Sequence, residues 1–190
     1  MKNSLRFNPP KEWNLMASGN RYYIGFSILI IDVLNTLRNK TNLKMLEIGS
    51  YKGESTFMFA SSGIFDEIHC IDPHRGNEEA NGIFNDNWEE IQEEFKLNTR
   101  YFNNITLHQD YSYNIVDKFE DGYFDFIYID GSHEYEDVKK DLELYLPKTN
   151  HLIGGHDYQK EWPGVVKAVD EIIGKPYKTY IDESWAHSII

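Results

Sequence analysis

Two carboxylates and two histidines lie in two short polar segments, Asp130-Gly-Ser-His133 and His156-Asp157. Each segment follows an apolar run of strand length, so both are expected at the ends of neighbouring strands. Asp130 and Asp157 are suited to share a divalent cation, with His156 as a third ligand or as a partner of the ligands. Carboxylate oxygens favour Mg²⁺, whereas a histidine ligand moves the preference towards Mn²⁺, Fe²⁺ or Zn²⁺.

His133 follows Asp130 closely and is predicted to act as a general base, because the intrinsic pKa of histidine lies near neutrality. Structural roles remain open for the same residues. Asp130 and Asp157 are each also placed to cap the helix that follows. His156 is equally suited to a hydrogen-bonded position in the core.

A second chemical motif lies earlier, in residues 43–56 (LKMLEIGSYKGEST). It predicts a buried strand, a turn that contains Gly49 and Gly53, and a helix with Ser55 and Thr56 near its start. Glycine lets the backbone turn tightly and approach a ligand closely. The free N–H groups of a helix start can bind polar or anionic ligand atoms.

Another short strand, 67–71, ends at Asp72, roughly twenty residues after Gly49, where a nucleotide-binding αβ unit holds ribose hydroxyls. Strand, glycine turn, helix, strand and acidic residue in this order indicate a nucleoside ligand. The dinucleotide fingerprint needs a third glycine, which is missing here, and the sequence contains no Gly-x-x-x-x-Gly-Lys-Ser/Thr phosphate loop. A ligand with an adenosine and no phosphate therefore fits better.

Residues 47–56 (EIGSYKGEST) resemble motif I of the class I S-adenosylmethionine-dependent methyltransferases. The later pattern Ile-Asp-Gly-Ser-His-x-Tyr-x-x-Val-x-x-Asp at 129–141, followed by Gly-Gly-His-Asp at 154–157, is similar to the small class I enzymes that include macrolide sugar O-methyltransferases. This resemblance covers most of the chain, from about residue 43 to 185. It implies S-adenosyl-L-methionine as the methyl donor.

By the same resemblance, the donor site has three parts. Its methionine part would be lined by Glu47, Gly49, Ser50 and Gly53. Asp72 would bind the ribose hydroxyls, and the adenine edge would meet Gln109, Asp110 and Tyr111. Ser55 and Asp130 are also assigned to donor binding. Each of these residues is also compatible with an ordinary turn position.

In the catechol-type relatives, a magnesium ion is held at the end of strand four and by a dyad after strand five. These positions match Asp130 and the pair His156-Asp157. The catechol-type base is a lysine three residues after the first metal aspartate, where this chain has His133, and the dyad is His-Asp where relatives have two oxygen ligands. We therefore expect O-methylation of a small-molecule or sugar hydroxyl, with His133 and Asp130 as catalytic residues and Mg²⁺ or Mn²⁺ as a cofactor.

Two other classes of function fit the sequence less well. The first is a non-catalytic nucleoside-binding or scaffold protein of the same fold. The second is a nucleotide-sugar or dinucleotide enzyme, which the missing third glycine and the absent Lys/Tyr catalytic pair disfavour. The methyl acceptor itself is not encoded in a readable motif.

The elements that position these residues alternate along the chain. Apolar runs predict strands at 45–48, 67–71, 105–108, 124–129 and 151–153, and helical periodicity predicts helices at 22–34, 88–102, 115–119, 138–145 and 165–173. Residues 177–181 and 185–190 predict a C-terminal antiparallel hairpin. The chain is therefore expected to be α/β, with a Rossmann-like, doubly wound, mainly parallel seven-stranded sheet and helices on both faces.

Residues 22–34 carry an apolar repeat at helical spacing: Ile24, Ile28, Ile31 and Leu34. The repeat predicts an amphipathic helix that packs this stripe against the sheet. The apolar run is too short to span a bilayer and is interrupted by Asp32, and the first ten residues lack the apolar core of a signal peptide. No membrane association is expected.

Composition sets the remaining limits. The 190 residues are expected to form one domain, with a helical cover at 1–42 and a Rossmann-like core at 43–190. A net charge of −12 disfavours nucleic acid as a partner, which leaves a small-molecule acceptor, and a homo-oligomer remains open.

The single cysteine, Cys70, cannot form an intramolecular disulfide, so a reducing compartment, the cytoplasm, is the default. The composition of the loop 74–87, with Arg75, suits a lid and plain disorder equally well.

Overall fold

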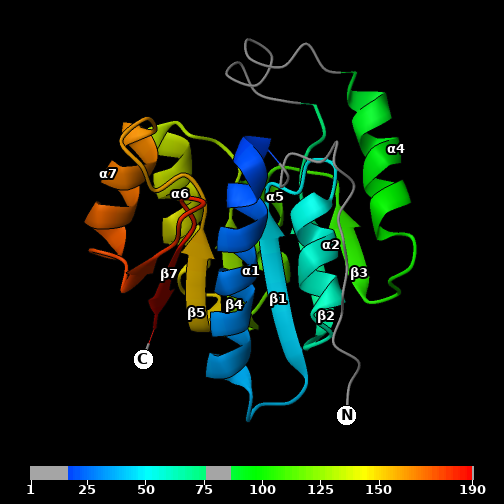
Figure 1. The fold of residues 1–190 in the computed structure, drawn as a ribbon, viewed down its shortest axis with the longest axis horizontal. Coiled ribbons are helices and arrows are strands. Elements are labelled where there is room, and N and C mark those ends of the chain that lie inside the picture. The colour runs from blue at the N-terminus through cyan, green and yellow to red at the C-terminus, as the bar shows by residue number, and fades with distance from the viewer. Residues whose placement is uncertain (1–16, 76–86, 190) are drawn as a thin grey trace.

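The computed structural model describes residues 17–75 and 87–189, with side chains described from Arg21 onward. Within them, seven strands form one sheet in the order β3-β2-β1-β4-β5-β7-β6 (Figure 1). The first five strands of this order run parallel, and β7 is antiparallel to both of its neighbours. The bounds are β1 (Leu43–Ile48), β2 (Phe65–Ile71), β3 (Ile105–His108), β4 (Phe124–Ile129), β5 (Thr149–Gly155), β6 (Lys178–Thr179) and β7 (Trp185–Ser188). The predicted fold class is confirmed.

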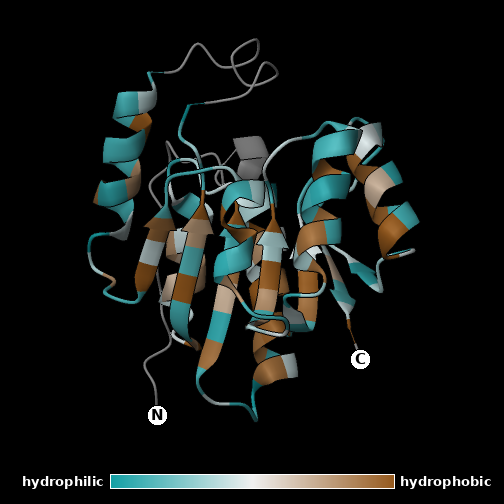
Figure 2. Cartoon of the chain, turned by 180° about the vertical axis from the view of Figure 1, so that it is seen from behind, coloured by the Kyte–Doolittle hydropathy of each residue, from teal (hydrophilic) through white to brown (hydrophobic). Residues whose placement is uncertain are grey.

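Helices cover both faces of the sheet (Figure 1). One face packs against α1 (Ala17–Leu37), α2 (Glu54–Ser61) and α4 (Trp88–Thr99). The other face packs against α5 (Ser112–Ile115), the 3₁₀ helix η2 (Val116–Lys118), α6 (Tyr135–Tyr145) and α7 (Pro163–Ile172). In the view from behind, the strands carry long hydrophobic stretches and α4 is mostly hydrophilic (Figure 2). No helix in the described part of the chain is long and apolar enough to cross a bilayer.

The central strands are apolar on both sides because helices cover both faces of a parallel sheet. Along β4, Phe126 and Tyr128 belong to the core on the α1 and α2 side, whereas Ile127 and Ile129 belong to the opposite core. This alternation follows from the two-residue period of a strand. The ring of Phe59 in α2 packs edge to face against Tyr128, with 5.2 Å between ring centroids.

The predicted packing face of the first helix is wrong for three of its four residues, since only Leu34 packs against the core. The side chains of Ile24, Ile28 and Ile31 are 47%, 39% and 53% exposed. The buried residues of α1 are instead Phe26, Leu29, Ile30, Val33 and Leu37. This helix is apolar around most of its circumference, so periodicity alone did not select the buried stripe. Its rotation is fixed by Gly25, because a Cβ atom there would lie 2.3 Å from the carboxylate of Asp182.

Other element boundaries differ by small amounts. β5 begins at Thr149, two residues before the predicted start, and α4 ends at Thr99, so that Phe102 follows the helix instead of belonging to it. Phe102 still packs against the core. The start of α4 is capped by Asn87, whose side chain accepts a hydrogen bond from the N–H of Glu89. Residues 1–16 of the predicted cover and 76–86 of the predicted lid lie outside the described residues.

The pairing of β4 with β5 contains an irregularity near its beginning. Phe124 pairs with Thr149 and Phe126 pairs with Leu152, so β5 has one more residue than β4 in this interval. Asp125 lies at this point. Its Oδ1 is 3.3 Å from Nδ2 of Asn150, and its Oδ2 accepts the backbone N–H of Lys44 in β1 at 2.9 Å. This carboxylate of β4 therefore contacts the beginnings of both neighbouring strands, β1 and β5.

At the opposite end of the same strands, the turn after β1 touches the end of β4. The N–H of Asp130 donates to the carbonyl of Ile48, and the N–H of Gly49 donates to the carbonyl of Ile71. Gly49 has a φ of 84°, and a Cβ atom at this position would lie 2.1 Å from the carbonyl oxygen of Asp130. The position therefore requires glycine for its backbone conformation and for this contact.

Gly49→Ala is expected to destabilise the protein much more than Gly63→Ala does. Gly63 also has a positive φ, 67°, but a Cβ atom there would meet nothing within 4 Å. Backbone strain alone costs about 1 kcal/mol, and the steric overlap at Gly49 adds about 2 kcal/mol or more. Urea unfolding of both variants measures the difference. Equal loss of stability in the two variants would contradict the importance of this contact.

Candidate functional site

Three of the predicted site residues form a cluster at the carboxyl ends of two adjacent strands. Asp130 follows β4, and His156 and Asp157 follow β5. Each residue offers one ligand atom, and these atoms lie within 4.8 Å of one another. The carboxyl ends of parallel strands are where open α/β sheets bind ligands. Among the described residues, this is the one group of three or more acidic, histidine or cysteine side chains placed to hold a metal ion.

Asp157 connects this cluster to His133. Its Oδ2 atom lies 2.9 Å from Nε2 of His133 and 3.2 Å from Nδ1 of His156. The ring of His133 stacks on Trp162, with 3.9 Å between centroids and 17° between planes. Asp157 has a φ of 59°, a left-handed conformation that aspartate tolerates better than most residues. The sharp turn after β5 thus directs this carboxylate towards both imidazoles.

The capping roles considered for the two aspartates do not occur. The residue that precedes α6 is Glu134, whose N–H donates to Oγ of Ser132, and the residue that precedes α7 is Trp162. Neither helix start receives a side-chain capping bond. Asp130 and Asp157 are therefore not held in place by helix ends.

The charges of the cluster depend strongly on one another. Burial lowers the pKa of His156, but the nearby carboxylates of Asp130 and Asp157 outweigh this effect and raise it to about 9. Burial raises the pKa of Asp130 to about 6, and the negative charge of Asp157 adds to the increase. Hydrogen bonds from His133 and His156 hold the pKa of Asp157 well below its usual range despite burial. At neutral pH the cluster thus holds a proton on His156 between carboxylates.

A small cavity adjoins the cluster. It is lined by Ile129, Asp130, Gly131, Ser132, His133, Val138, His156, Asp157, Val165 and Trp185. Its volume of about 10 Å³ is roughly the space of one water molecule. The indole N–H of Trp185 is buried and has no hydrogen-bond partner within the described structure. The cluster therefore combines polar ligand atoms with space for a small group.

Among the residues predicted for donor binding, Glu47 is completely buried beneath the glycine turn. Its carboxylate accepts hydrogen bonds from the side chains of Ser55 and Thr56, and burial raises its pKa to about 7. Oε1 of Glu47 and Oγ of Ser50 are buried without a partner in the described structure. Buried polar atoms are normally paired, so these two atoms fit a polar ligand at this turn.

The second glycine of the turn serves the packing of the protein itself. Gly53 has a φ of 78° and precedes α2. A Cβ atom there would lie 2.9 Å from the ring of Phe95 in α4. The structure therefore places Gly53 beneath α4, whereas Gly49, which follows β1, contacts the end of β4.

Asp72 lies at the end of β2 with its carboxylate directed to the same turn. Its Oδ2 atom accepts the backbone N–H groups of Ser50 at 3.0 Å and Tyr51 at 2.7 Å. Its Oδ1 atom accepts the N–H of His74 at 2.8 Å. The residue predicted to bind ribose hydroxyls thus also shapes the glycine turn.

The residues predicted for adenine lie after β3. Gln109 is exposed. Oδ1 of Asp110 accepts the backbone N–H of Tyr111 at 2.8 Å and Nδ2 of Asn114 at 2.7 Å, and these bonds lower the pKa of Asp110. The ring of Tyr111 stacks on Tyr113 with 5.3 Å between centroids. This side of the site therefore offers a carboxylate and a partly exposed aromatic ring.

Three residues at the site were not assigned individual roles from the sequence, although the segment 13–23, which includes Tyr22, was predicted to cover the donor or to form a subunit contact. His74 contacts Asp72, Trp162 stacks on His133, and the ring of Tyr22 in α1 lies 5.8 Å from that of His156. Each belongs to a segment whose place depends on tertiary packing. For His74, its position three residues after the end of β2 was a usable signal. No spacing rule links Tyr22 or Trp162 to the cluster.

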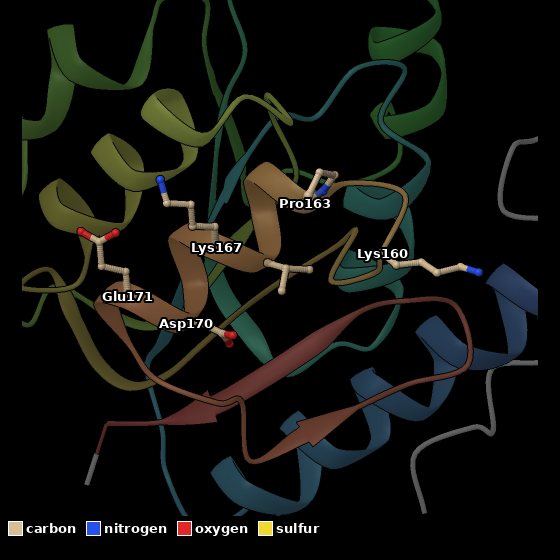
Figure 3. A pocket seen from close by; sticks show the side chains of 6 residues that line it. Lys160, Pro163, Lys167, Asp170 and Glu171 are labelled. Carbon is tan, nitrogen blue, oxygen red and sulfur yellow. The ribbon is translucent and has the colours of Figure 1, made fainter.

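A larger depression lies elsewhere, on the outer side of α7 (Figure 3). It is an open hollow of about 650 Å³ lined by Lys160, Pro163, Val166, Lys167, Asp170 and Glu171. Asp170 is paired with Lys175, and Glu171 with Lys139. Because these charges are satisfied at the surface and none belongs to the cluster, we do not assign chemistry to this hollow.

Comparison with known proteins agrees with this geometry. Residues 46–158 match a family model described as a methyltransferase domain, and the match includes the glycine turn, Asp130 and Asp157. The chain belongs to this methyltransferase-domain family. The match covers more than half of the chain, from β1 to the residue after the cluster. The predicted family is thus confirmed.

Individual relatives of this methyltransferase domain are more distant. An uncharacterized protein of Acanthamoeba polyphaga mimivirus is 32% identical over 184 residues, which cover 84% of this chain and 75% of that protein. A structure from Staphylococcus aureus, described as a candidate caffeoyl-CoA O-methyltransferase, has a TM-score of 0.57 at 19% identity, over 85% of this chain and 82% of the other. A candidate S-adenosyl-L-methionine-dependent methyltransferase from Methanococcus maripaludis has a TM-score of 0.50 at 21% identity, over 81% and 66%. The two structures show the shared fold.

Glu47→Gln is expected to change how stability depends on pH. The pKa of Glu47 is raised from 4.5 to about 7, so the folded protein holds a proton that the unfolded chain releases, and stability falls as pH rises between these values. At about 1.4 kcal/mol per pKa unit, the loss approaches roughly 3 kcal/mol. The amide that replaces the carboxyl group in this variant stays neutral at all pH values. As the pH rises from 4.5 to about 7, the wild type should therefore lose stability relative to the variant.

Urea unfolding of both proteins between pH 4.5 and 8 measures this difference. Subtraction of the two pH profiles removes the contribution of the other titrating groups. A constant difference across this range would show that Glu47 is ionised in the folded protein.

Proposed function

We propose that this methyltransferase domain transfers the methyl group of S-adenosylmethionine to a hydroxyl group of a small molecule or sugar, with assistance from a divalent cation. The observation that carries the proposal is the contact between the two halves of the site. Gly49 of the donor turn packs directly on the backbone of Asp130, a member of the ligand cluster. A donor bound at the turn and an acceptor bound at the cluster would therefore be neighbours.

The residues around the turn fit the polar groups of the donor. Glu47 and Ser50 have buried oxygen atoms without partners at the methionine side. Asp72 offers a carboxylate oxygen at the ribose side, and Asp110 offers one at the adenine side. Methyl transfer from a sulfonium is a direct displacement, so the main task of these residues is to align the donor with the attacking atom.

The cluster also fits a divalent cation. Asp130, His156 and Asp157 supply two carboxylates and one imidazole with mutually close ligand atoms. The carboxylates suit Mg²⁺, and the imidazole moves the preference towards Mn²⁺. A cation bound there would lower the pKa of the acceptor hydroxyl and orient it. The three side chains would hold this cation, and the proton on His156 must leave when its ring nitrogen becomes a ligand.

His133 is the proposed general base. A carboxylate accepts hydrogen bonds, so Oδ2 of Asp157 holds the hydrogen on Nε2 of His133, and Nδ1 becomes the basic nitrogen. Trp162 stacks on the ring and fixes its plane. Asp157 would stabilise the imidazolium that forms when the acceptor proton moves to His133, as carboxylates do in other base-orienting pairs.

The comparisons support a hydroxyl acceptor at the level of fold. The Staphylococcus aureus structure is described as a candidate caffeoyl-CoA O-methyltransferase, and the similarity covers most of both chains. A small acceptor is also consistent with the position of Tyr22, which places an aromatic ring beside His156 on the α1 side. The negative net charge disfavours nucleic acid as the acceptor.

Calorimetric titration tests the two binding sites separately. Chelator-treated protein is expected to bind S-adenosylhomocysteine with micromolar affinity and to give a separate heat with Mg²⁺ or Mn²⁺. Asp157→Asn should abolish the metal heat and retain the nucleoside heat. Asp121→Asn is the matched control, because Asp121 is an exposed partner of Lys148 and lies far from the cluster in the fold.

The nucleoside heat and the metal heat test different parts of the proposal. Absence of nucleoside binding under all conditions would overturn the methyltransferase activity. Nucleoside binding with no metal heat, or with a metal heat that Asp157→Asn retains, would overturn the metal-assisted mechanism only.

The base is tested with hydroxyl-containing acceptors. A panel of catechols and sugars is incubated with labelled S-adenosylmethionine, and the methyl ether of each active compound is the negative control. For an active acceptor, His133→Gln is expected to lower kcat by about 10²–10⁴-fold, the usual contribution of a general base, while S-adenosylhomocysteine binds as in the wild type. An unchanged kcat would exclude His133 as the base.

A further inference from the structure

We propose that His74 is a positioning residue of the donor site, which holds the glycine turn and Asp72 in the arrangement that receives the ribose of the donor. The inference rests on the proposed function, because it concerns the binding of the same donor. It assigns a role to a residue that lies two positions after Asp72 and outside the motifs that led to the family.

The contacts of His74 reach both parts of the donor turn. Its backbone N–H donates to Oδ1 of Asp72 at 2.8 Å, and its Nε2 lies 2.9 Å from the carbonyl oxygen of Tyr51. Oδ2 of Asp72 in turn accepts the N–H groups of Ser50 and Tyr51. Residues 50, 51, 72 and 74 therefore form a closed set of hydrogen bonds across the ends of β1 and β2.

The partner of the imidazole identifies the ring atom that donates. A carbonyl oxygen only accepts hydrogen bonds, so Nε2 of His74 carries the hydrogen. Nδ1 is buried without a partner in the described structure. The residue is only 1% exposed. His74 thus acts on the turn through a single donor atom, Nε2, and through its backbone N–H.

These bonds limit what Asp72 can offer to a ligand. A carboxylate has about four acceptor sites, and three are used by backbone N–H groups of residues 50, 51 and 74. The remaining site lies on Oδ1, the atom bonded to His74. Asp72 therefore offers one acceptor site to a ribose hydroxyl, and this site is oriented before the donor binds. Such preorganisation reduces the ordering cost of binding.

His74 also packs on the ring of Phe95 in α4, with 5.6 Å between centroids. The test must therefore separate this packing from the hydrogen bond to Tyr51. Two substitutions do so. The amide nitrogen of Gln reaches approximately the position of Nε2 of His, whereas the shorter Asn places its amide near the position of Nδ1. Both variants lose the ring contact with Phe95, but only His74→Gln retains a donor within reach of the Tyr51 carbonyl.

The full chain and both variants are titrated with S-adenosylhomocysteine by calorimetry. We expect His74→Asn to raise the Kd about tenfold, in line with the loss of one hydrogen bond. The Kd of His74→Gln should remain within about threefold of the wild-type value. The heat of Mg²⁺ or Mn²⁺ binding serves as the control, because the metal cluster lies after other strands and should be unchanged in both variants.

The outcomes distinguish this inference from the proposed function. If the wild type binds S-adenosylhomocysteine and His74→Asn binds it equally well, His74 has no positioning role. Equal weakening in the Asn and Gln variants assigns the effect to ring packing and likewise overturns the proposal. If the wild type does not bind the nucleoside, the proposed function fails, and the positioning role fails with it.

Discussion

The site depends on one steric constraint, the contact between Gly49 and the backbone of Asp130. The two residues follow strands that are adjacent in the sheet although far apart in the chain. Because no side chain separates them, the turn that would hold the donor and the cluster that would hold a cation form one surface. A larger residue at position 49 would separate these two halves, so the fold and the proposed chemistry require the same small residue.

The same region concentrates ionisable groups that burial disfavours. Glu47 lies beneath the turn, and burial raises its pKa. Asp130 and Asp157 lie together, and a protonated His156 reduces the repulsion between them. None of these groups is needed to build a hydrophobic core, since the sheet is already covered on both faces. Perturbed groups of this kind are typical of functional sites, where structure is retained for binding and catalysis at a cost in stability.

The sequence was sufficient for features that depend on local pattern. Apolar runs that end in polar residues predict the five parallel strands, the glycine turn and the acidic residues that follow β2 and β4. The buried face of α1 did not follow, because this helix is apolar on several sides and Gly25 decides its rotation through a contact with Asp182. The contacts of His74 and Trp162 did not follow either, since their partners are a carbonyl group and an imidazole that only the folded chain brings near.

The extra residue of β5 has a consequence for how such a site can change in evolution. It lies beside Asp125, about 16 Å from the cluster at 3.3 Å per strand residue. Without it, all later residues of β5 would shift by one relative to β4, and side chains would exchange faces. His156 and Asp157 would then no longer face Asp130 in the present way. Insertions and deletions near the start of β5 are thus linked to the geometry of the cluster at its end. The two ends of the strand must therefore vary together.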